Sequence, residues 1–189
     1  MEEIAVLKFG GTSVKNVARI HHVAELISKF PAKKKLVIVS AMGDTTDNLI
    51  KLAKQCSPDI SERELDLLLA TGEQVSITLL AIALGSHGIK AKSFTGNQLG
   101  ILTDSSHTAA RIIDIDRNLL NNAIDENDVV VIAGFQGCSE EGEVTTLGRG
   151  GSDTSAVAIA AAAKAKVCHI FTDVDGIFSA DPNVVDEAK

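Results

Sequence analysis

The chain has 189 residues, enough for one substantial domain, and its 45% content of hydrophobic residues predicts a folded globular interior. The formal net charge of −7 argues against a general attraction for nucleic acid or for an anionic membrane surface. Aromatic residues make up only 3%, with no Trp or Tyr, so few side chains can stack on nucleic-acid bases.

Short apolar runs alternate with amphipathic stretches from the beginning of the chain. Residues 4–9, IAVLKF, are typical of a buried strand, and the apolar spacing over 13–30 predicts a helix. Residues 35–41, KLVIVSA, form a continuous apolar run, which predicts burial on both faces and therefore a parallel sheet covered by helices.

The same alternation continues to the end of the chain. Further helices are predicted over 45–55, 61–88 and 114–125 and through the alanine-rich segment after Gly151. The segment 61–88 is predicted to form two helices that break near Thr71 and Gly72. Asp114 is predicted to cap the helix over 114–125. Further strands are predicted over 89–96, 100–104, 128–137 and 167–176, with a hairpin or flap over 138–148. No apolar run is long enough for a membrane span, since polar loops interrupt each one.

This order of elements predicts a three-layer α/β/α sandwich with a mostly parallel central sheet, formed by residues 1–189 as one domain. In such sheets ligands bind where the carboxyl ends of the strands meet. Four predicted strand ends carry polar, glycine-rich sequence: residues 10–13, 40–46, 134–137 and 172–176.

Two of the loops predict a site for an anion. Gly10 and Gly11 follow the first strand, where backbone N–H groups can approach an anion, and Lys8 adds a positive charge. The lysine precedes the glycines, so this is not a Walker A loop, and a tight turn beside a surface lysine is the alternative.

The second loop, LGRGGSDTSA, opens the alanine-rich helix. Ser152 and Asp153 can cap that helix, and Arg149 can hold a carboxylate or phosphate with two parallel hydrogen bonds. Asp153 either caps the helix or orients a lysine or a bound magnesium ion.

Other polar residues leave alternatives open. Glu73 stands in an apolar segment and is either buried for a purpose or a first-turn acid of the next helix, and Asp173 with Asp175 forms either a magnesium site or a plain turn. The five histidines have no ligand spacing. The three cysteines form no CxxC pair, which fits a reduced cytoplasm and predicts no zinc site.

Five motifs occur in an order that resembles the aspartate kinases of the amino acid kinase family. They are KFGGTSV at 8–14, VSAMGDTTDNL at 39–49, LLATGEQVS at 68–76, TTLGRGGSDTSAVAIA at 145–160 and FTDVDGIFSADP at 171–182. The resemblance implies ATP- and Mg²⁺-dependent phosphorylation of the β-carboxylate of L-aspartate, at the head of lysine, threonine and methionine synthesis. The expected partners are L-aspartate and ATP, with no nucleic acid and no membrane, and a homo-oligomer is allowed. The cysteine pattern described above gives the cytoplasm as the expected location.

The resemblance also assigns roles to single residues. Lys8 would contact the transferring phosphates, with Gly10, Gly11 and Ser13 around them, and Asp153 would hold Lys8. Aspartate would be bound by Ser40, Thr46, Glu73 and Arg149, and the nucleotide by Thr172, Asp173 and Phe178.

The chain also departs from the family pattern. Phe178 and Asn183 stand where tyrosine and arginine are usual. The family continues with another stretch of kinase domain, which supplies a lysine near the nucleotide, and then with paired regulatory ACT domains. Neither is part of residues 1–189, so the kinase domain is expected to be incomplete at its carboxyl end. A non-catalytic remnant that binds ligand or a full-length subunit is therefore the alternative. A dinucleotide-dependent oxidoreductase is disfavoured, because no GxGxxG follows the first strand.

Overall fold

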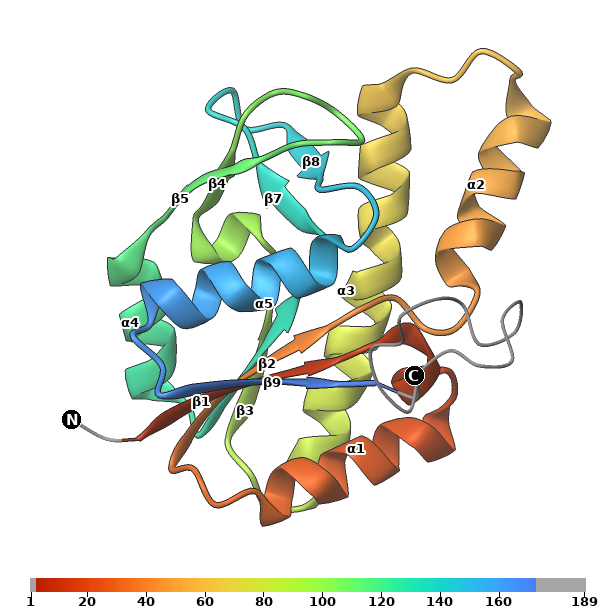
Figure 1. Cartoon of the computed structure of the whole chain (residues 1–189). Coiled ribbons are helices and arrows are strands. Elements are labelled where there is room, and N and C mark those ends of the chain that lie inside the picture. The colour runs from red at the N-terminus through yellow and green to blue at the C-terminus, as the bar shows by residue number, and fades with distance from the viewer. Residues whose placement is uncertain (1–2, 173–189) are drawn as a thin grey trace, which may run out of the picture.

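The computed structural model describes residues 3–172, which form a parallel sheet between two layers of helices (Figure 1). Neighbouring strands of this sheet run in the order β3-β6-β2-β1-β9, and every pair is parallel. The strands are β1 (Ile4–Phe9), β2 (Lys34–Val39), β3 (Ala91–Phe94), β6 (Val129–Ala133) and β9 (Val167–Phe171). The predicted α/β sandwich with a mostly parallel sheet is confirmed.

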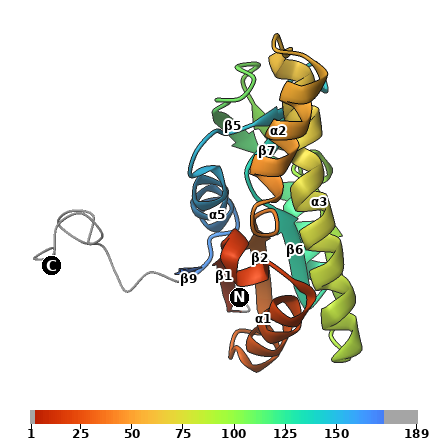
Figure 2. The ribbon, with the colours of Figure 1, turned by 90° about the vertical axis from the view of Figure 1, so that its right-hand side faces the viewer.

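Helices cover both faces of the sheet, as Figure 2 shows for α5 and α3 on opposite sides. One face packs on α1 (Val17–Lys29) and α3 (Glu62–Ser86), and the other packs on α4 (Arg117–Glu126) and α5 (Gly151–Ala162). Along β2, Val37 and Val39 join the first core, whereas Leu36 and Ile38 join the second. Because successive side chains of a strand point to opposite faces, burial on both sides requires the continuous apolar run.

A second, smaller sheet lies beyond the carboxyl ends of the main strands. Its order is β5-β4-β7-β8, from β5 (Ile112–Ile115), β4 (Ile101–Thr103), β7 (Gln136–Cys138) and β8 (Val144–Thr146). The hairpin predicted over 138–148 is the antiparallel pair β7–β8, whereas β5 was not predicted. The strand predicted over 128–137 is confirmed over the residues of β6, but it does not continue to 137, because Phe135 has φ 68° and the chain turns there from one sheet into the other.

Helix α3 is continuous over 25 residues, so the predicted break near Thr71 and Gly72 is wrong. A Cβ atom at Gly72 would lie 2.9 Å from the Cβ of Ala41, so this glycine allows a close approach to the loop after β2. Without the break, α3 has the length and composition of a membrane span. The expectation that polar loops interrupt every long apolar run is therefore wrong for this helix, and half of its most apolar window is buried inside the fold.

The helix starts also differ from the predictions. A short 3₁₀ turn, η1 (Gly11–Val14), precedes α1, and Asn16 caps α1 by accepting a hydrogen bond from the backbone N–H of Arg19 at 3.0 Å. Asp116 caps α4, whereas Asp114 lies in β5, so the predicted cap was two residues too early. Helix α2 (Thr45–Cys56) packs beside α3, and a 3₁₀ turn, η2 (Asn97–Leu99), precedes β4.

Candidate active site

The loops after β1, β2 and β6 meet the amino end of α5. The Gly43 N–H donates to the Gly11 carbonyl at 3.0 Å, which joins the first two loops. The hydroxyl groups of Ser40 and Ser152 are 3.0 Å apart, which joins the second loop to α5. Segments that are far apart in the sequence therefore form one surface at the carboxyl edge of the sheet, where ligands of parallel sheets bind.

A cavity of about 310 Å³ opens at this edge. Seven residues for which the sequence predicts a role line it together: Lys8, Gly11, Ser40, Thr46, Glu73, Arg149 and Asp153. Gly10 and Ser13 belong to the same first loop, where the Ser13 N–H donates to the Gly10 carbonyl at 3.0 Å. Thr172 directly follows β9, and Asp173 and Phe178 lie outside the described residues.

Lys8 and Asp153 form an ion pair across the two glycine-rich loops. The Lys8 Nζ is 2.7 Å from a carboxylate oxygen of Asp153, and the lysine side chain is only 12% exposed, against 49% for the aspartate. Lys8 points from β1 and Asp153 from the first turn of α5. An ammonium group has three donor hydrogens, so Lys8 can hold Asp153 and still donate to an anion in the cavity.

The amino end of α5 forms one wall of the cavity. Gly150 precedes the helix with φ 76°, a left-handed conformation that favours glycine. Ser152 and Asp153 lie inside the first turn and make no side-chain cap, so the predicted capping role is wrong for both. The partial positive charge of the helix terminus favours an anionic ligand beside Gly150 and Gly151.

Glu73 brings a buried carboxylate into the cavity from the middle of α3. It is 2% exposed, and its Oε1 accepts a hydrogen bond from the Ala41 N–H at 3.0 Å. Its Oε2 is buried and has no hydrogen-bond partner among the described residues. Burial raises the pKa of Glu73 to about 7, although the Ala41 N–H partly offsets this effect. Such a carboxylate is suited to accept a cationic group from a ligand.

Arg149 lies between Gly148 and Gly150 on the opposite loop and is exposed. It forms no ion pair with any residue between positions 3 and 172 that the structure describes. The cavity therefore has one buried acid and one exposed guanidinium, which together suit a ligand with both an ammonium and a carboxylate group.

Sequence reasoning missed two contributors to the cavity. Phe135 lines it from the turn after β6, and Ala41 lines it and orients Glu73. The glycines at 134 and 137 predicted a loop after β6, but no pattern in the sequence indicated that Phe135 would line a cavity there.

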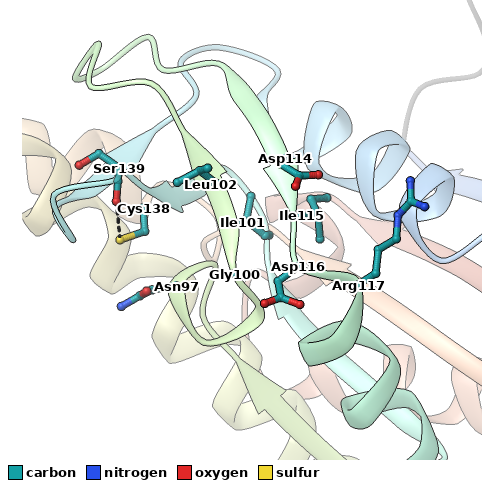
Figure 3. Close-up of a pocket in the computed structure, with 10 residues that line it drawn as sticks. All are labelled: Asn97, Gly100, Ile101, Leu102, Asp114, Ile115, Asp116, Arg117, Cys138 and Ser139. Atoms are coloured by element: carbon teal, nitrogen blue, oxygen red, sulfur yellow. Dashed lines mark hydrogen bonds between the residues drawn. The ribbon is translucent and has the colours of Figure 1, made fainter.

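A second hollow of about 730 Å³ lies over the smaller sheet (Figure 3). Its walls come from β4, β5, the start of α4 and the end of β7, and they include Asp114, Asp116 and Arg117. Of the predicted site residues that lie between positions 3 and 172, none lines this hollow.

Comparison with known proteins defines the class to which this arrangement belongs. The model of the amino acid kinase family matches residues 3–189, and the chain belongs to that family. It is 55% identical over 188 residues to the aspartokinase of Geobacillus stearothermophilus and 52% identical over 188 residues to that of Thermus thermophilus. Each alignment covers 98% of this chain and 46% of the relative, so the chain spans about half the length of these curated relatives.

Solved structures agree with this assignment. The aspartate kinase of Synechocystis superposes with a TM-score of 0.80 at 48% identity, over 98% of this chain and 31% of that chain. E. coli aspartokinase III, in complex with aspartate and ADP, gives 0.83 at 27% identity, over 99% and 53% respectively. An isopentenyl phosphate kinase, at 16% identity and a TM-score of 0.70, shares the fold.

Proposed function

We propose that this protein transfers the γ-phosphoryl group of ATP to the β-carboxylate of L-aspartate, giving 4-phospho-L-aspartate and ADP as the first step of lysine, threonine and methionine synthesis. The observation that carries the proposal is the cavity in which the Lys8–Asp153 ion pair, Glu73 and Arg149 lie together. Similarity to aspartokinases, one of them solved with aspartate and ADP, supports the choice of substrates.

The amino-acid end of the substrate is assigned to two opposite walls. Glu73 takes the α-ammonium group through its unpartnered oxygen, and Arg149 takes the α-carboxylate through two parallel hydrogen bonds. Ser40 and Thr46 supply hydroxyl groups at the cavity wall between them. With both α-substituents held, the β-carboxylate is left to reach the phosphoryl group near Lys8.

The reaction needs little proton chemistry. A substrate β-carboxylate is already ionised at neutral pH, so no general base is required. One of its oxygens forms a bond to the γ-phosphorus, and the bond from that phosphorus to the β–γ bridging oxygen breaks as ADP leaves. Lys8, with the backbone N–H groups of the loop that contains Gly10, Gly11 and Ser13, stabilises the charge that develops on the phosphoryl oxygens. Asp153 keeps Lys8 in position.

The nucleotide and its metal ion are proposed to approach from the end of β9, where Thr172, Asp173 and Phe178 follow. Neither carboxylate of the cavity is left for a metal ion, since Asp153 pairs with Lys8 and the second oxygen of Glu73 is assigned to the α-ammonium group of the substrate. Magnesium would therefore enter with ATP, held mainly by phosphate oxygens and water, and would neutralise phosphate charge.

A second candidate function is ligand binding without turnover, alone or paired with a full-length subunit. It is favoured by the chain's span of about half the length of its curated relatives. Under either function we infer a cytoplasmic protein, because Cys56, Cys138 and Cys168 are all free. A homo-oligomer is compatible with both functions.

An activity assay with a matched variant tests the main proposal. The chain is incubated with ATP, Mg²⁺, L-aspartate and hydroxylamine, and aspartyl hydroxamate is measured. Lys8→Ala should lower the rate about a hundredfold, which is the usual effect of removing one charge-stabilising group. An unchanged rate would exclude Lys8 from the mechanism. Calorimetry that shows ATP and aspartate binding without hydroxamate would favour the second function, and binding of neither ligand would reject both.

A further inference from the structure

A second buried acid lies on α3 outside the cavity and has an unusually full set of partners. Asp66 is 0% exposed. Its carboxylate accepts hydrogen bonds from the Thr146 hydroxyl at 2.5 Å, the Thr146 N–H at 3.1 Å and the Thr108 N–H at 3.0 Å. The Nδ1 of His107 lies 2.8 Å from the same carboxylate. We call these four residues the Asp66 hub.

The hub fixes the segment that carries Arg149. Thr146 is the last residue of β8, three positions before Arg149, and its carbonyl accepts from the Ala110 N–H at 2.9 Å. The next residue, Leu147, donates its N–H to the Phe135 carbonyl at 2.8 Å. The segment from Thr146 to Arg149 is therefore bonded to the Asp66 hub through Thr146 and to the cavity wall through Leu147.

The loop on the other side of the hub supports the same segment. Thr108 has φ 64°, which is strained for a β-branched residue and persists only where the surroundings hold it. A Cβ atom at Gly148 would lie 3.1 Å from the Thr108 carbonyl oxygen, so the two backbones are close together there. Displacement of Thr108 would therefore be transmitted to Gly148 and to its neighbour Arg149.

Helix α3 carries both buried acids. Asp66 and Glu73 are seven residues apart, which is two helical turns, so they lie on the same side of one rigid element. Glu73 lines the cavity directly, whereas Asp66 reaches it through Thr146 and the segment that follows. A charged group buried with every partner satisfied fixes geometry, because any displacement leaves donors or charge unpaired.

We propose that Asp66 is a positioning residue that sets the distance between Glu73 and Arg149, so that one amino acid can occupy both. This inference rests on the proposed function, in which those two residues hold the α-ammonium and the α-carboxylate of aspartate. Asp66 itself touches no substrate and acts through Thr146 and Thr108.

The test compares Asp66→Asn with a control at a neighbouring buried hydrogen bond. The Asn side chain keeps the shape of Asp but directs an NH₂ group at a backbone donor. The control, Thr103→Val, removes a buried hydrogen bond between the hydroxyl groups of Thr103 and Thr145, which are 2.6 Å apart. Thr145 directly precedes Thr146 of the hub, so the control removes a bond close to the hub without changing the hub itself. Calorimetry measures L-aspartate and ATP affinities, and hydrogen–deuterium exchange measures backbone protection of residues 146–149 without ligand.

Asp66→Asn should weaken aspartate binding roughly tenfold or more, leave ATP affinity unchanged and speed exchange at residues 146–149. Thr103→Val should leave all three unchanged, even if it lowers the Tm. If Asp66→Asn does not fold, Thr146→Val, which removes one of the hub's donors, should produce a smaller change in the same direction.

Different results would indicate failure of this inference and failure of the proposed function. If the unmodified chain binds no aspartate, the proposed function fails, and the exchange data alone then decide whether Asp66 holds the Arg149 segment. If exchange at 146–149 is the same in the folded Asp66 variant and the unmodified chain, the positioning role is overturned. Equal loss of aspartate and ATP binding would also overturn it, since it would indicate a general structural effect.

Discussion

Asp66 and Glu73 are two buried acids on the same side of one helix, and their surroundings are opposite. Among residues 3–172, Asp66 receives three hydrogen bonds and lies beside His107, whereas Glu73 receives one, from the Ala41 N–H, and keeps an oxygen without a partner. The raised pKa of Glu73, about 7, follows from burial with so little compensation. Asp66, whose carboxylate is fully hydrogen-bonded, stabilises the fold, whereas Glu73, whose carboxylate accepts fewer hydrogen bonds, is available to bind a ligand.

Removing the carboxylate of Asp66 should have the largest effect on the stability of the fold. Asp66→Ala leaves two backbone N–H groups and the Thr146 hydroxyl buried without an acceptor. We expect the free energy of unfolding to fall by about 3–5 kcal/mol, as when one partner of a buried charged network is deleted. Urea denaturation monitored by circular dichroism measures this, and a loss below about 1 kcal/mol would contradict the role of the hub.

Replacing Glu73 with a neutral residue should raise the free energy of unfolding, in contrast to the loss expected for Asp66→Ala. Because the folded-state pKa of Glu73 lies above its ordinary value of 4.5, the native state binds more protons than the unfolded state between about pH 4.5 and 7. Stability is therefore lost as the pH rises through this window. Glu73→Gln keeps an acceptor for Ala41 and should be more stable than the unmodified chain at pH 8, by up to about 3 kcal/mol.

The measurement for this variant is denaturation at pH 5 and at pH 8. The unmodified chain should lose stability relative to Glu73→Gln between these two values. If the difference between the two proteins is the same at both pH values, Glu73 does not titrate in this window and the contrast with Asp66 is lost.

Arg149→Lys changes the wall of the cavity that lies opposite Glu73. The charge remains but the planar pair of donors is lost, so the KM for aspartate should rise about ten- to thirtyfold while the KM for ATP changes little. Steady-state kinetics with each substrate varied in turn measures this. An unchanged KM for aspartate would remove Arg149 from the binding of the α-carboxylate.

The smallest effect is a pH dependence of aspartate binding. An ammonium group binds the ionised form of Glu73, and a pKa of about 7 means that this form becomes dominant between pH 6 and pH 8. The Kd for aspartate should therefore fall about tenfold over this range, as the ionised fraction rises. Calorimetry at three pH values measures it. Glu73→Gln should bind aspartate weakly with no such dependence, and a parallel pH dependence in both proteins would assign the titration elsewhere.

Much of the fold followed from local pattern. The continuous apolar runs in β2 and β6 required burial on both faces and so predicted the covered parallel sheet. The glycine-rich ends of these strands placed the ligand at the carboxyl edge, and seven of the predicted site residues line one cavity there. The prediction of the sheet succeeds because the periodicity of a strand is set by residues that are neighbours in the sequence.

Long-range packing decided what local pattern could not. Gly72 suggested a helix break, but its lack of a Cβ serves the contact between α3 and Ala41. Local pattern left Asp153 as either a cap or a partner of a lysine, and the fold places it against Lys8 of another element, the contact that the family resemblance implied. Asp66 gave no signal at all, because its partners Thr108 and Thr146 are about 40 and 80 residues away in sequence. The sequence alone determined the layers, the strand ends and the types of charge available, whereas the pairing of each charge depended on surfaces that meet only in the folded chain.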